Sequence, residues 1–226
     1  AEALQVEQNR VRLNSRNEII LHKEQEQVYL KLLSGTSVLL TAPTSFGKSV
    51  LIDAFICSKR PKCCVILVPT IALLDEVRRR LQSHANGYKI LTQATATPAE
   101  YSIYVMTPER YLEIEERPSP DFFVIDEFYK LAIPYDSGSQ SGSIVEFDER
   151  SVALNLCYRE LSASNAQFLM CSPYVESIGE MLCRNGDRFT TNFSPVRQQY
   201  EFRTDWNKEA DRIPDIKSLI RDGNLG

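Results

Sequence analysis

The chain alternates between short apolar, β-branched segments and longer segments whose apolar residues recur every three or four positions. The first kind of segment predicts buried strands, and the second kind predicts amphipathic helices. The predicted strands cover residues 37–41, 64–68, 88–92, 103–106, 122–125 and 167–171, and the predicted helices cover residues 48–58, 71–83, 108–115 and 149–162. Because strands and helices alternate, we expect an α/β fold with a doubly wound, mostly parallel sheet and with ligands at the carboxyl ends of its strands.

Three segments do not follow this alternation. Residues 1–16 place apolar residues between charged ones and are predicted to form a leading helix, whereas residues 136–143 are small and polar and are predicted to be a mobile loop. After Asn185 the chain becomes polar, with one short predicted helix at 213–221. We therefore expect a helical lead over residues 1–20, one domain over 21–195, and the start of a link to another domain over 196–226.

Length and composition are those of a soluble protein with one large α/β domain. Of the 226 residues, 43% are hydrophobic and 25% are charged, and no apolar run approaches the ~20 residues that span a bilayer. The first residues lack the apolar stretch and cleavage site of a secretory signal, so we expect a cytoplasmic protein without a membrane partner. The six cysteines form no C-x-x-C pair, which favours reduced, buried thiols over disulfides or a metal centre.

A phosphate-binding loop is predicted at residues 42–49, which have the sequence A-P-T-S-F-G-K-S. The segment lies between a predicted strand and a predicted helix, which is the context that phosphate loops require. Its backbone N–H groups can surround a phosphate, its lysine can reach the β- and γ-phosphates, and its last serine can hold Mg²⁺. The first glycine of the general pattern is replaced by Ala42. We expect ATP and Mg²⁺ as ligands, with nucleotide contacts from Thr44, Ser45, Phe46, Gly47, Lys48 and Ser49.

An acidic pair, Asp126 and Glu127, ends the apolar segment V-I-D-E at residues 124–127. A carboxylate at the end of a strand beside a phosphate loop can hold Mg²⁺, and a second carboxylate can deprotonate the attacking water. We therefore expect Asp126 to be a metal-binding residue together with Ser49. Glu127 is the predicted general base, and Lys48, Asp126 and Glu127 are the predicted catalytic residues of ATP hydrolysis. The alternative is that the acidic pair merely caps a helix.

Four segments, taken in order, resemble motifs I, Ia, Ib and II of the superfamily 2 (DEAD/DExH-type) helicases. They are A-P-T-S-F-G-K-S at 42–49, L-V-P-T-I-A-L at 67–73, T-P-E-R at 107–110 and V-I-D-E at 124–127. Ala-Pro-Thr in place of the first glycine is the usual form in that family. The resemblance implies a RecA-like P-loop NTPase fold, the first lobe of a two-lobe helicase, and is closest to bacterial DExH-type proteins of DNA processing and phage defence.

The resemblance also assigns roles outside the phosphate loop. Gln25 would bind the adenine edge, with Gln27 as a rival candidate, and His22 would stack on the base. The alternative for Gln25 is a surface residue of a helix. Motifs Ia and Ib would hold the phosphates of a nucleic-acid strand through Pro69, Thr70, Thr107 and Arg110, although T-P-E alone is typical of an ordinary helix cap. Residues 78–80, three consecutive arginines, are predicted to form a solvated helix face.

Two positions depart from the family pattern. Tyr129 stands at the fourth position of motif II, where the named subfamilies carry Asp or His. Motif III is usually Ser-Ala-Thr, whereas the corresponding segment here is Cys171-Ser172-Pro173. Ser172 would then keep one hydroxyl of the relay that couples nucleotide state to the grip on the strand.

These motifs predict an ATP-dependent helicase or translocase that grips single- or double-stranded nucleic acid, with DNA favoured over RNA. The net charge of −4 indicates only a local cationic track for that strand. A second lobe, C-terminal to this sequence, would supply the arginines that complete the site, so residues 1–226 alone should be nearly inactive. The alternatives are a regulatory nucleotide-binding module that acts through a protein partner without nucleic acid, and another phosphate-loop ATPase or kinase.

Overall fold

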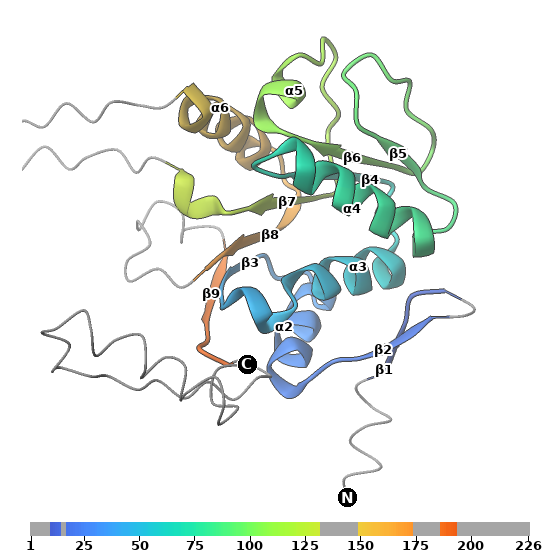
Figure 1. The fold of residues 1–226 in the computed structure, drawn as a ribbon, viewed down its shortest axis with the longest axis vertical. Helices are drawn as coiled ribbons and strands as arrows, with labels where there is room; N and C mark the ends of the chain where they lie inside the picture. The colour runs from blue at the N-terminus through green and yellow to red at the C-terminus, as the bar shows by residue number, and fades with distance from the viewer. Residues whose placement is uncertain (1–9, 15–16, 132–148, 174–185, 194–226) are drawn as a thin grey trace, which may run out of the picture. The chain divides into compact units, whose positions relative to one another are not determined.

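The computed structural model describes residues 10–14, 17–131, 149–173 and 186–193 (Figure 1). The chain divides into two compact units, residues 1–193 and 194–226, and every described residue belongs to the first. The predicted loop at 136–143 and the predicted helix at 213–221 lie outside the described residues. Among the residues described, no helix is long and apolar enough to cross a membrane.

A seven-stranded sheet forms the centre of this unit, in the order β5-β6-β4-β7-β8-β3-β9 (Figure 1). Each pair of neighbouring strands is parallel. The prediction of an α/β fold with a mostly parallel sheet is therefore confirmed. The strands are β3 (Val38–Thr41), β4 (Cys63–Leu67), β5 (Lys89–Leu91), β6 (Ser102–Met106), β7 (Phe122–Asp126), β8 (Gln167–Ser172) and β9 (Asp187–Thr190).

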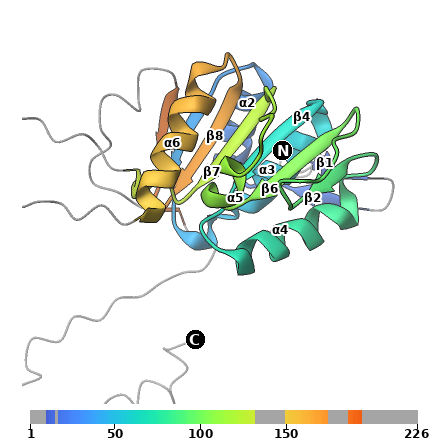
Figure 2. The same ribbon diagram turned by 90° about the horizontal axis from the view of Figure 1, so that it is seen from above.

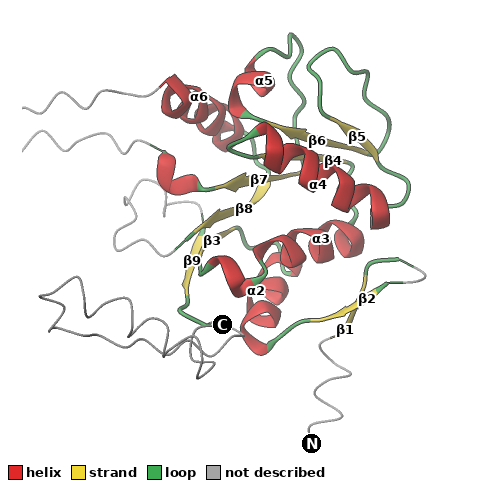
Figure 3. Ribbon diagram, viewed as in Figure 1, coloured by secondary structure: helices red, strands yellow, loops and turns green. Residues whose placement is uncertain are grey.

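Helices cover both faces of the sheet, as the views in Figures 2 and 3 show. Side chains of α2, α3 and α4 pack with one set of strand residues, and side chains of α5 and α6 pack with the other set. In β7, Phe122 and Val124 belong to the first cluster, whereas Phe123 and Ile125 belong to the second, as the two-residue period of a strand requires. The helices are α2 (Lys23–Leu33), α3 (Lys48–Lys59), α4 (Ile71–His84), α5 (Pro108–Leu112) and α6 (Glu149–Ala163).

The six predicted strands and the four helices predicted between residues 48 and 162 are present, and their ends differ from the predicted ones by at most three residues. No strand was predicted at β9, which lies in the polar segment after Asn185. The predicted leading helix is wrong for residues 10–12, because these residues form strand β1 (Arg10–Arg12), antiparallel to β2 (Glu18–Ile20). Val11 is buried between two exposed arginines, so these three residues follow the strand period and not the helix period.

Candidate nucleotide and nucleic-acid site

The predicted phosphate loop connects the carboxyl end of β3 to the first residue of α3. Residues Thr44–Phe46 form one 3₁₀ turn, and Gly47 follows with a φ of 79°, in the left-handed region that favours glycine. A Cβ atom at Gly47 would lie 2.6 Å from Nε2 of Gln25. The backbone conformation therefore favours glycine, and a larger residue would displace the side chain of Gln25.

Lys48 lies at the start of α3, and its side chain folds back onto the loop. Its Nζ donates hydrogen bonds to the carbonyl oxygens of Ala42 at 2.9 Å and Pro43 at 3.1 Å. Burial lowers the pKa of this ammonium group, and the nearby carboxylates of Asp126 and Glu127 oppose that shift. A half-buried cation whose acceptors are two loop carbonyls fits a site that receives phosphate oxygens.

Asp126 is the last residue of β7, two strands away from β3 in the sheet. Its Oδ1 accepts a hydrogen bond from the backbone N–H of Glu127 at 3.0 Å. Burial raises the pKa of Asp126, whereas this hydrogen bond and the charge of Lys48 act in the lowering direction. Lys48 and Asp126 each affect the pKa of the other, and they follow or end strands β3 and β7 of the same sheet. This arrangement fits Mg²⁺ bound with a triphosphate.

Glu127 has a left-handed backbone with a φ of 57°, which is uncommon for a residue other than glycine. It turns the chain from β7 into the 3₁₀ helix Phe128–Lys130, where the buried ring of Phe128 anchors the turn. Its Oε2 contacts the ammonium group of Lys130 and lies 3.4 Å from the hydroxyl of Tyr129. The predicted base is therefore held by side chains of its own turn.

Gln25 lies on α2 and connects that helix to the phosphate loop. Its Nε2 donates to the carbonyl oxygen of Phe46 at 2.8 Å, and its Oε1 accepts from the backbone N–H of His22 at 3.0 Å. Gln25 is buried, so the reading of Gln25 as a surface residue is wrong, whereas the rival candidate Gln27 is exposed. A base-contacting role for Gln25 and His22 stays a prediction.

Motif Ia begins α4, and a hollow of about 120 Å³ lies beside it. The Oγ1 of Thr70 accepts a hydrogen bond from the backbone N–H of Leu73 at 3.3 Å, so this hydroxyl caps the helix. The hollow lies at the carboxyl ends of β4 and β7, and its lining includes Pro69, Thr70, Pro108, Glu109, Asp126, Lys130 and Arg150. The motif Ia residues and the motif II carboxylate therefore border one hollow.

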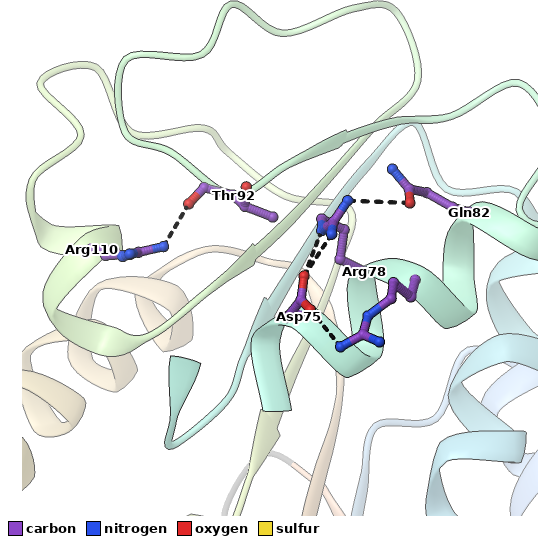
Figure 4. Close-up of polar contacts among 6 residues, drawn as sticks. Asp75, Arg78, Gln82, Thr92 and Arg110 are labelled. Carbon is purple, nitrogen blue, oxygen red and sulfur yellow. Dashed lines mark hydrogen bonds and ion pairs between the residues drawn. The ribbon is translucent and has the colours of Figure 1, made fainter. Parts of the chain in front are cut away.

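The two predicted motif Ib residues do not line this hollow. Thr107 is buried before α5 and its side chain makes no capping hydrogen bond. The guanidinium of Arg110 donates to the carbonyl oxygen of Thr92 at 3.3 Å (Figure 4). Pro108 and Glu109 are the members of motif Ib that border the hollow.

Ser172 ends β8, the strand between β7 and β3. Its register partner on β3 is Thr41, and the preceding residue, Cys171, is the register partner of Asp126 on β7. The carbonyl oxygen of Ser172 accepts from the N–H of Ala42, while its hydroxyl donates to the carbonyl of Pro173 at 2.6 Å. The segment lies beside both nucleotide motifs, and the coupling role of the Ser172 hydroxyl stays a prediction.

Residues 22–173 match a protein-family profile described as DEAD/DEAH box helicase. The chain belongs to the DEAD/DEAH box helicase family. It is 39% identical over 161 residues to "Anti-bacteriophage protein B" of Escherichia coli (strain K12), an alignment that covers 70% of this chain and 22% of that protein. The chain therefore spans about a fifth of the length of this curated relative.

Solved structures of helicases resemble this fold at low sequence identity. The superposition on the crystal structure of DUF1998 helicase MrfA covers 89% of this chain and 34% of the MrfA chain, with a TM-score of 0.58 and 16% identity. The Pyrococcus furiosus Hef helicase domain matches 74% of this chain and 37% of its own, with a TM-score of 0.48 and 16% identity. The MrfA match agrees with the RecA-like fold expected for a DEAD/DEAH box helicase domain.

Sequence reasoning missed an aromatic residue in this helicase domain. The ring of Phe193 packs against His22 in a tilted arrangement, with centroids 4.3 Å apart and an interplanar angle of 33°. Phe46 meets the same imidazole edge-on at 4.9 Å. Phe193 follows β9, which pairs with β3, and the hydroxyl of Thr191 contacts the carboxylate of Glu24. Nothing in the polar tail predicts this contact, because it depends on a strand pairing distant in sequence.

The three consecutive arginines do not share one environment. Arg78 and Arg79 both bond to Asp75 on the outer surface of α4, as predicted for a solvated face (Figure 4). Arg80 contradicts that prediction, because its Nε donates at 2.7 Å to Asp53, a buried carboxylate on α3. The helical period of about 3.6 residues per turn points Arg80 toward α3.

Proposed function

We propose that this DEAD/DEAH box domain is the first lobe of an ATP-dependent nucleic-acid motor. The observation that carries the proposal is the position of Asp126. This carboxylate is electrostatically coupled to Lys48 of the phosphate loop and also lines the hollow beside Pro69 and Thr70 of motif Ia. A motor must couple ATP hydrolysis to its binding of the nucleic-acid strand, and two sites that share one wall can provide that coupling.

Each side chain of the nucleotide site has a role in this proposal. Lys48 exchanges its two carbonyl acceptors for phosphate oxygens, and Ser49 and Asp126 hold Mg²⁺, which neutralises charge on the phosphates. Glu127 accepts the proton of the attacking water. Gln25 bonds α2 to the loop and would contact the base of the nucleotide.

A complete site requires donors on the open side of the γ-phosphate, where charge builds up in the transition state. Arg110 is the cation of motif Ib, and it is bonded to Thr92 away from the phosphate loop. We therefore infer that a second lobe supplies the missing arginines, which contribute about 10³–10⁵ in rate in comparable enzymes. Residues 1–226 alone should hydrolyse ATP near background.

The proposed substrate is DNA, with RNA as the alternative. This preference rests on the resemblance of the D-E-F-Y segment at residues 126–129 to bacterial DNA-processing helicases. The name of the Escherichia coli relative, "Anti-bacteriophage protein B", supports a role in defence against phage. Contacts to backbone phosphates do not separate DNA from RNA, so the distinction requires a direct comparison of strands.

The test is a titration of fluorescent single strands, DNA and RNA of matched sequence, into a longer chain that carries the second lobe. We expect the affinity to change when a non-hydrolysable ATP analogue is added, and we expect ATP hydrolysis to be stimulated by the strand. Residues 1–226 in the same assays should show neither stimulation nor appreciable turnover. Nucleotide binding without any nucleic-acid binding would overturn the motor and favour a module that acts through a protein partner.

A further inference from the structure

Lys130 occupies a position between the proposed base and the proposed strand site. Its ammonium group contacts Oε2 of Glu127, and the hydroxyl of Tyr129 lies 3.4 Å from the same oxygen. The hydrogen bond to Glu127 is the main cause that raises the pKa of Lys130, so the lysine stays charged at neutral pH. Its side chain is 42% exposed, so the ion pair is reachable by solvent and by ligands.

The same lysine also lines the hollow beside motif Ia, together with Arg150 of α6. The charge of Arg150 acts to lower the pKa of Lys130, so the two cations repel each other across the hollow. An anion between them would remove that repulsion and accept hydrogen bonds from both. Thr70 and Ser151 add hydroxyl groups to the wall, and Glu109 is the one acidic side chain besides Asp126 among the lining residues.

We propose that Lys130 and Arg150 form a subsite for a backbone phosphate of the nucleic acid, and that Lys130 is shared between this subsite and Glu127. Without a strand, the lysine holds the glutamate carboxylate. A phosphate in the hollow competes for the ammonium group and releases the carboxylate toward the attacking water. The inference rests on the proposed motor function and gives it a route for stimulation by nucleic acid.

The released carboxylate of Glu127 can act as the base in ATP hydrolysis. The oxygen of the attacking water bonds to the γ-phosphorus as the bond to the bridging oxygen breaks and ADP leaves. Glu127 takes the proton that the water gives up. While Lys130 is bonded to Oε2, that oxygen has a competing donor, and the carboxylate is a weaker base. Lys130 follows directly after Tyr129, the residue at which motif II departs from the pattern of the named subfamilies.

The exposure of the Lys130–Glu127 ion pair limits how much its removal can change ATP turnover. A partly exposed ion pair lowers the reactivity of its carboxylate by about two- to fivefold at most, because solvent screens it. Lys130→Met removes the charge and keeps the length of the side chain, so it should raise ATP turnover without nucleic acid by that factor. Lys130→Arg is the conservative comparison, because it retains the cation that pairs with Glu127.

Arg150→Met removes the second cation of the subsite and leaves the Lys130–Glu127 ion pair in place. It should weaken strand binding. Because the two cations share one phosphate, each substitution should also reduce the slope of log K against log salt for single-strand binding, by up to about 0.7. A merely structural role for Lys130 would not change this slope.

The experiment uses the longer chain with its second lobe, and measures ATP turnover with and without single-stranded DNA as well as strand affinity at several salt concentrations. Higher basal turnover in Lys130→Met, together with lower salt slopes in both variants, supports the inference. If nucleic acid stimulates the wild type but Lys130→Met has the wild-type basal rate and salt slope, the proposed role of Lys130 is overturned. The proposed motor function would still stand. A wild-type protein that hydrolyses ATP without any response to nucleic acid overturns both.

Discussion

A buried ion pair joins the helix of the phosphate loop to the helix of motif Ia, and its removal should have a large effect on stability. Asp53 of α3 is 3% exposed, and its Oδ2 accepts from Nε of Arg80 at 2.7 Å. Nε2 of His84 lies 3.1 Å from the same oxygen without hydrogen-bond alignment. Oδ1 of Asp53 has no hydrogen-bond partner among the described residues. Arg80 therefore supplies both the hydrogen bond and the positive charge that offset the burial of this carboxylate.

Arg80→Met should destabilise the domain strongly, because it leaves a buried carboxylate without its cation. Breaking a fully buried pair in this way costs about 3–5 kcal/mol. The side chain of Arg80 is 24% exposed. Water can therefore reach part of the pair, and we expect a loss of about 2–4 kcal/mol. Asp53→Leu should cost less, about 1–2 kcal/mol, because the unpaired guanidinium can turn toward solvent.

The double variant, in which apolar side chains replace both partners, should lie within about 1 kcal/mol of the wild type, because no buried charge remains. Urea denaturation followed by circular dichroism gives the free energies of unfolding for the complete double-mutant cycle. Arg79→Met is the matched control: Arg79 pairs with Asp75 and is 69% exposed, so its loss should cost less than about 1 kcal/mol. An Arg80→Met variant as stable as Arg79→Met would refute this reasoning.

Three substitutions test the nucleotide site. Lys48→Ala should abolish ATP binding in calorimetric titration and leave the fold intact, because the ammonium group contributes charge to phosphates and lies outside the apolar core. Gly47→Ala should weaken ATP binding in the same titration, since a φ of 79° costs a non-glycine residue about 1–3 kcal/mol and the new Cβ would displace Gln25. Glu127→Gln should keep Mg-ATP binding and lose turnover in the two-lobe chain, as measured by phosphate release, because an amide cannot take the proton.

The central strands were predictable because they are short, continuous runs of apolar residues. Residues 122–125 and 64–68 are apolar on both faces, which is the pattern of a parallel strand covered by helices on each side. The phosphate loop and the acidic pair were equally predictable, since each follows such a strand. Their positions at the carboxyl end of one sheet then follow from the parallel topology.

The features that sequence reasoning missed depend on contacts between distant segments. Phe193 reaches His22 only because β9 pairs with β3, and Asp53 meets Arg80 only because α3 packs beside α4. No local pattern marks either partner. The contact of Lys130 with Glu127 depends on the left-handed backbone at Glu127, a conformation that propensities do not predict for glutamate.

Asp126 is expected to stabilise ligand binding while destabilising the empty fold. Burial is the main cause that raises the pKa of its carboxyl, although the N–H of Glu127 and the charge of Lys48 act in the other direction. A pKa that is higher in the folded state means that the folded protein binds this proton more tightly than the unfolded chain does. At pH values above both pKa values the ionised carboxylate therefore lowers stability, and this penalty disappears as the pH falls through the raised folded-state pKa.

Asp126→Asn removes this charge and keeps an oxygen that can accept the hydrogen bond from Glu127. Without ligand, we expect the variant to be more stable than the wild type at mildly alkaline pH, with a difference that shrinks on acidification. Saturating Mg-ATP should reverse the order, because a ligand stabilises only the protein that binds it, by about 2.7 kcal/mol at a hundred times its Kd. Urea denaturation across pH, with and without Mg-ATP, measures both effects. If Asp126→Asn is less stable than the wild type in the absence of ligand at alkaline pH, burial does not dominate the energetics of this carboxylate.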